Sequence, residues 1–104
     1  MTAEIIVRRP KNKYNDFFRR YQIYINDKLY FDLKRGEEGR ATLPEGFYEM
    51  IAKIDWCGSK TLKFTAENGG MYEFICQNNV PPFRINEYIT SRQDEYLLLE
   101  MLNN

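Results

Sequence analysis

The sequence predicts an all-β protein, a single small antiparallel β-sandwich of about seven to nine short strands. Three features of the chain point to it. Apolar and polar residues alternate in short runs, turn-forming residues separate these runs, and aromatic residues make up 15% of the chain. Alternation places every second side chain on one face of a strand, and large rings suit such half-buried surfaces. A chain of 104 residues suits one domain, which we expect to span 1–104.

Seven runs show the strand pattern. The longest, 47–56, places five residues on one face: Tyr48, Met50, Ala52, Ile54 and Trp56. The predicted strands cover residues 4–8, 21–25, 29–33, 40–43, 47–56, 61–66 and 71–76.

Turn chemistry joins these runs. Asn26-Asp27-Lys28 predicts a tight hairpin, because Asn and Asp tolerate left-handed backbone angles. Pro44-Glu45-Gly46 predicts a β-turn. Glu67-Asn68-Gly69-Gly70 predicts a hairpin that pairs 61–66 with 71–76 and sets Cys76 opposite Thr61. Cys57 then lies too far along for a disulfide with Cys76.

The C-terminal segment is open to two interpretations. Leu, Glu and Met in 96–102 favour a short helix, and Ser91 with Asp94 resembles a capping box. An extended run over 86–91 and a hairpin returning through 92–95 fit equally well. We favour a strand here and keep the short helix as the alternative.

No secretory or membrane segment is predicted, because the first ten residues hold only three consecutive apolar residues before Arg8, Arg9 and Pro10. We therefore expect a cytoplasmic protein without membrane contact, whose two cysteines are thiols. The chain has no histidine, the commonest general base and metal ligand. Two cysteines alone do not make a zinc site. We expect no enzyme activity, no cofactor and no metal.

The sharpest local motif is a corner after the longest strand, formed by Asp55, Trp56, Cys57 and Ser59. Cys57 as a nucleophile needs a positive neighbour, and Asp55 opposes ionisation of the thiol. We favour a structural corner instead. In it Trp56 plugs one end of the core, and Asp55 accepts hydrogen bonds from the amides of Gly58 and Ser59.

A basic segment with interleaved aromatic residues follows the first strand. Such a pattern can bind phosphates and stack bases, although an isoelectric point near 6.3 argues against a dedicated nucleic-acid binder. The candidate polyanion-binding residues are Arg8, Arg9, Lys11, Lys13, Arg19 and Arg20.

Part of the chain resembles a group of small bacterial domains of unknown function. The likeness covers most of 8–74, and its most specific part is Ala52-Lys53-Ile54-Asp55-Trp56-Cys57-Gly58-Ser59, with an Ile-Asp-Trp-Cys-x-Ser corner. This chain departs from the group at Lys28, where glycine is frequent. The resemblance implies a β-sandwich and a bacterial source, and it implies no activity.

These observations favour a non-enzymatic module that acts through contacts with an unidentified protein partner, as a regulator or an interaction domain. The alternative function is binding of nucleic acid or another polyanion through segment 8–20. The sequence leaves open whether the protein is a monomer or a homodimer.

Overall fold

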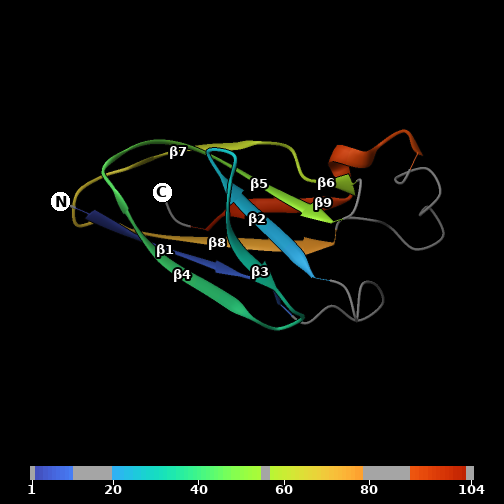
Figure 1. Cartoon of the computed structure of the whole chain (residues 1–104), viewed down its shortest axis with the longest axis horizontal. Coiled ribbons are helices and arrows are strands. Elements are labelled where there is room, and N and C mark those ends of the chain that lie inside the picture. Colours follow the sequence, from blue (N-terminus) through green and yellow to red (C-terminus); the bar gives the residue numbers. More distant parts are fainter. Residues whose placement is uncertain (1, 11–19, 55–56, 79–89, 103–104) are drawn as a thin grey trace.

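The computed structural model describes residues 2–10, 20–54, 57–78 and 90–102, and these residues form nine strands and one 3₁₀ helix (Figure 1). The strands are β1 (Thr2–Arg8), β2 (Tyr21–Ile25), β3 (Lys28–Leu33), β4 (Glu38–Pro44), β5 (Gly46–Ile54), β6 (Cys57–Gly58), β7 (Leu62–Ala66), β8 (Met71–Asn78) and β9 (Leu97–Met101). The 3₁₀ helix η1 (Gln93–Glu95) precedes β9.

Two sheets pack face to face, which confirms the predicted all-β sandwich. Sheet A has the strand order β4-β1-β8-β9. Sheet B has the order β3-β2-β5-β6, and β7 also pairs with β5. The chain changes sheet between β1 and β2, β3 and β4, β4 and β5, and β7 and β8.

The core lies between the inner faces of the two sheets, as period-two alternation requires. Of the predicted face of the longest strand, Met50, Ala52 and Ile54 are buried. Phe64 of sheet B stacks on Tyr48 and meets Phe74 of sheet A at a centroid distance of 4.9 Å. Apolar rings from both sheets therefore join the two layers.

The predicted hairpin at Asn26 is confirmed. Asn26 and Asp27 have φ angles of 49° and 65°, so both lie in the left-handed region that a two-residue turn between twisted strands requires. The Asn26 side chain also accepts a hydrogen bond from the backbone N–H of Glu49 on β5, at 3.0 Å. The turn is thereby fastened to its own sheet.

One strand pair differs from the predicted antiparallel arrangement: β1 and β8 run parallel, with Ile5 opposite Tyr72 and Val7 opposite Phe74. After β1 the chain crosses to sheet B, returns once to sheet A as β4, and passes through sheet B again before β8 enters beside β1. Alternation within a strand fixes its buried face but not the direction of its neighbour.

The predicted hairpin between 61–66 and 71–76 is wrong. β7 pairs with β5, with Met50 opposite Leu62, and β8 belongs to the other sheet. Residues 67–70 therefore form a bridge between the sheets, held by hydrogen bonds from Gly69 N–H to the Thr2 carbonyl and from Glu67 N–H to the Tyr72 hydroxyl. Neither cysteine is in a disulfide, although the pairing used to predict this does not exist.

The favoured strand near the C-terminus is confirmed, since β9 pairs antiparallel with β8. The alternative helix is limited to the single turn of η1. Most of the predicted extended run 86–91 lies outside the described residues.

A one-residue irregularity in the return from β5 through β6 to β7 places Ser59 in an unusual role. Cys57 pairs with Ile54 and Leu62 pairs with Met50, so the register shifts by one residue between them. Across this gap Ser59 N–H donates to the Ala52 carbonyl, and the Ala52 N–H donates to the Ser59 hydroxyl oxygen, each at 2.9 Å. The hydroxyl thus replaces a backbone carbonyl in the ladder.

The predicted capping of Ser59 N–H by Asp55 is therefore wrong, because this amide donates to Ala52 instead. Asp55 and Trp56 themselves lie outside the described residues. Gly58 is required at the same place, because a Cβ there would lie 2.6 Å from the Ala52 carbonyl oxygen.

We expect Ser59→Ala to lower the free energy of unfolding by about 1–3 kcal/mol, because it leaves the buried Ala52 N–H without its acceptor. Urea denaturation measures the loss. Thr65→Ala, at an exposed position of β7, is the matched control. Equal stability of Ser59→Ala and the wild type would contradict the ladder role of the hydroxyl.

Candidate functional site: the edges of the sandwich

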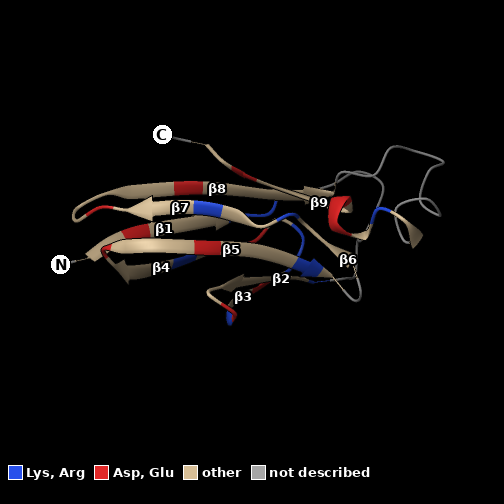
Figure 2. Ribbon diagram, turned by 90° about the horizontal axis from the view of Figure 1, so that it is seen from above, with Lys and Arg blue, Asp and Glu red and all other residues tan. Residues whose placement is uncertain are grey.

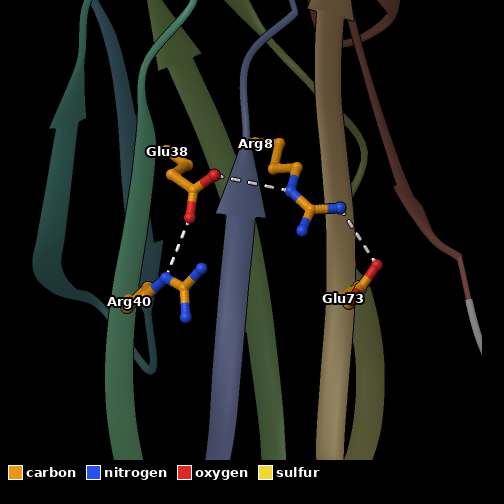
Figure 3. Close-up of polar contacts among 4 residues, drawn as sticks. All are labelled: Arg8, Glu38, Arg40 and Glu73. Atoms are coloured by element: carbon orange, nitrogen blue, oxygen red, sulfur yellow. Dashed lines mark hydrogen bonds and ion pairs between the residues drawn. The ribbon is translucent and has the colours of Figure 1, made fainter.

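Arg8, the first residue of the predicted basic surface, is balanced by carboxylates. It ends β1 between β4 and β8, and its guanidinium lies 3.6 Å from the Glu38 carboxylate and 3.1 Å from that of Glu73 (Figure 3). Arg40 bonds the same Glu38 at 2.8 Å and thereby lowers the pKa of its carboxyl. This network on the outer face of sheet A holds two basic and two acidic groups, so it is not a polyanion site.

Arg9 does not belong to an exposed basic surface, contrary to its place among the predicted candidates. It is 1% exposed, donates a hydrogen bond from Nη1 to the Leu33 carbonyl at 2.9 Å, and lies 3.6 Å from the centroid of the Tyr21 ring. A buried guanidinium on an aromatic face packs and hydrogen-bonds at once. Arg9 therefore joins β1 to β2 and β3 across the sandwich.

Of the rest of the predicted basic set, the structure describes Arg20 alone. Arg20 lies 3.7 Å from Asp32, and Lys11, Lys13 and Arg19 lie outside the described residues. Figure 2 shows basic and acidic positions interspersed along the strands of the described part. The structure does not gather the described members of the set into one basic patch.

The described part of the predicted corner, residues 57–59, is buried in sheet B. Cys57 and Ser59 are both buried, and Ser59 completes the ladder between β5 and β6. Cys76, the other thiol, is fully buried in the core, and burial raises its pKa to about 12. Such a thiol is the opposite of an activated nucleophile. In the described part of the chain no cluster of His, Cys, Asp or Glu side chains is arranged to hold a metal ion.

One side of the sandwich is closed where β3 and β4 form the edges of the two sheets. The connection between these strands is short, and the Phe31 ring of β3 packs on Gly39 of β4, where a Cβ would lie 2.4 Å from the ring. Glu38, Arg40 and Pro44 lie along β4. Charges and proline on an edge strand hinder the addition of another strand.

The other side is open at β9, the last strand of sheet A. Leu102 N–H donates to the Glu73 carbonyl, so the pairs that bond β9 to β8 are those of Leu102, Glu100 and Leu98. Because bonded and non-bonded pairs alternate in an antiparallel ladder, the amides of Leu97, Leu99 and Met101 point away from β8. No described strand pairs with this edge.

A cleft of about 450 Å³ lies beside this edge, between the start of β7 and the η1–β9 segment. Lys60 and Glu95, which both line the cleft, form an ion pair at 3.8 Å. Thr61 and Asp94 add polar groups. The apolar lining consists of Leu62, Leu97, Leu98 and Leu99.

A second hollow, of about 360 Å³, lies on the outer face of sheet B beside the Asn26–Asp27 turn. Glu49, Ile51, Lys53 and Thr61 complete its lining. Asn26 already bonds the Glu49 amide, and Lys53 lies 4.8 Å from the Tyr24 ring centroid. Asn26 and Lys53 therefore already have partners within the sheet.

The chain matches no protein-family model, and no curated protein is significantly similar to it in sequence. The resemblance to a group of small bacterial domains therefore stays a prediction. Within the described ranges, no helix combines the length and the apolar character needed to cross a bilayer. The open edge at β9, which the sequence reasoning missed, is the feature best suited to binding. The sequence feature that could have predicted this edge is the run Leu97-Leu98-Leu99, which lacks the charged residues that protect β4.

We expect Cys76 to react with Ellman's reagent at pH 8 no faster than the protein unfolds, because the thiol is buried and its pKa is raised to about 12. Cys57→Ser isolates this thiol for the measurement. In denaturant, without reductant, the wild-type chain should release two equivalents, one for each cysteine. Rapid labelling of Cys76 in the folded protein would refute its burial.

Proposed function

We propose that this chain is a non-enzymatic β-sandwich module that binds a protein partner, and that the partner adds an extended strand to β9. The observation that carries the proposal is the outer edge of β9, where three amides point away from the sheet beside an apolar cleft. In strand addition, main-chain hydrogen bonds supply affinity and pockets for alternate side chains supply specificity.

The contrast between the two sides of the sandwich supports this choice. The β3–β4 side carries charges, a proline and the Phe31–Gly39 contact. β9 has the sequence Leu-Leu-Leu-Glu-Met, with neither proline nor lysine. An edge strand left without such protection invites pairing with another chain.

The chemistry of the side chains supports a role without catalysis. The chain has no histidine, and its most buried thiol has a pKa raised to about 12. The two thiols, neither of them in a disulfide, also favour a reducing compartment, so we place the module in the cytosol.

We expect Leu98→Lys to weaken capture of the partner, because lysine on an edge strand opposes strand addition. Thr42→Lys is the matched control, since it adds the same charge to the same outer face of sheet A at its opposite edge. The wild type and both variants are used as tagged baits in nuclease-treated lysate. Hydrogen exchange of the captured complex should then show slower exchange across 97–101 than in the isolated protein.

Equal capture by Leu98→Lys and the wild type would contradict the proposal. Protection confined to residues outside β9 would contradict it as well, because the partner would then bind elsewhere.

The alternative, polyanion binding through segment 8–20, has less support, because Arg8 is balanced by Glu38 and Glu73 and Arg9 is buried. We expect no affinity for mixed-sequence DNA or RNA tighter than about 10⁻⁴ M at physiological salt, the weak end of non-specific binding. Fluorescence anisotropy across a salt series measures it. Micromolar binding with a log–log salt slope of about −2 to −4, lost on replacing Arg8, Lys11 and Lys13 by Ser, would reverse this ranking.

A further inference from the structure

The occupant of the β9 edge can be specified by the chemistry of the two faces it would extend, a step that rests on the proposed function. A strand added to β9 bonds the outward amides of Leu97, Leu99 and Met101. Residues directly opposite each other on neighbouring strands point to the same face of the sheet. Each position of the added strand therefore inherits the environment of its partner in β9.

The inner positions of the added strand must be apolar. Leu97 and Leu99 are buried and point toward the core, and both line the cleft together with Leu62. Side chains opposite them enter this cleft, whose volume of about 450 Å³ is in the range of sites for small ligands. Lys60, the basic group at the cleft, is already paired with Glu95. A charged side chain entering beside these leucines would lose its hydration against apolar surface, whereas an apolar side chain is stabilised by burial there.

The outer positions carry the charge preference. Glu100 is exposed on the outer face of sheet A, and it forms no ion pair with any residue in the described part. The row that contains it crosses the sheet as Glu38, Arg8, Ile75 and Glu100. Within this row Arg8 already pairs with Glu38 (Figure 3). At the other end of the row, the residue of the added strand opposite Glu100 faces a carboxylate that has no ion-pair partner in the described part.

From these two faces we infer that β9 binds an extended polypeptide segment with apolar side chains at alternate positions and a lysine or arginine opposite Glu100. The pairing length is set by β9, which has five residues. A second copy of this chain fits less well. A two-fold pairing of β9 about Leu99 would set Glu100 beside Leu98 and leave the carboxylate unmatched.

Short synthetic peptides with blocked ends test this chemistry on the intact protein. One alternates valine with lysine, one valine with glutamate, and one serine with lysine. Amide chemical shifts of β9 in an NMR titration at low salt report both the site and the affinity. We expect the valine–lysine peptide to shift the amides of Leu97, Leu99 and Met101, and to bind about two- to fivefold more tightly than valine–glutamate. The serine–lysine peptide should produce no saturable shift.

Glu100→Lys should reverse the order of the two valine peptides. Glu4→Lys is the matched control, because it makes the same charge change on the same outer face, on β1, away from the edge. Equal affinity of the valine–lysine and valine–glutamate peptides would overturn the charge preference while strand addition stands. Binding of serine–lysine as tight as that of valine–lysine would overturn the apolar requirement.

Two further outcomes would contradict the inferred segment as a whole. If none of the peptides shifts the β9 amides, both strand addition and its chemistry are wrong. If the protein alone self-associates and protects the same amides, the occupant is a second copy, and the inferred segment is wrong.

Discussion

The outer amides of edge strands constrain this protein more than any single contact. Every sheet of a sandwich ends in two strands whose outward N–H and C=O groups have no partner within the sheet. The two sides of this sandwich differ in how their edge strands are protected. β3 and β4 meet through a short turn, a ring packed on Gly39, and an edge strand bearing Glu38, Arg40 and Pro44. β9 carries one charged residue, Glu100, and no proline, and an apolar cleft lies beside it. The binding site we propose follows from this asymmetry.

The same demand for backbone partners explains the two polar groups buried in the described part. Ser59 lies between β6 and β7, where the register with β5 shifts by one residue. Its hydroxyl oxygen accepts a hydrogen bond from the Ala52 N–H, which would otherwise have no partner. Arg9 follows β1, where the chain leaves sheet A, and its guanidinium reaches the Leu33 carbonyl at the end of β3. In both cases a side chain forms a hydrogen bond with a backbone group that has no partner in the ladder. Neither arrangement has the open, charged geometry of a binding or catalytic group.

The strands could be predicted from the sequence because alternation and turn residues are local signals. β2 matches its predicted range, and the β2–β3 turn has the left-handed angles that Asn26 and Asp27 suggest. Pairing could not be predicted in the same way. Runs 61–66 and 71–76 are adjacent and in phase, yet they belong to different sheets, because alternation does not identify the sheet a strand joins. The burial of Arg9 escaped prediction for a related reason: an arginine beside other basic residues suggests a solvated surface, and only the tertiary fold brings Tyr21 and Leu33 to it.

The contrast between Arg8 and Arg9 also decides between the two functions. Arg9 follows β1 and continues its pairing, because its N–H donates to the Glu37 carbonyl. Adjacent side chains on such an extended backbone point to opposite faces, so this basic pair does not present both charges to one ligand. Arg8 faces outward between two carboxylates, and Arg9 packs on Tyr21 in the interior. The fold thus separates two basic residues that are adjacent in the sequence. At β9 alternation places Leu97 and Leu99 toward the core and Glu100 on the outer surface. One strand then offers a partner both an apolar and an acidic face.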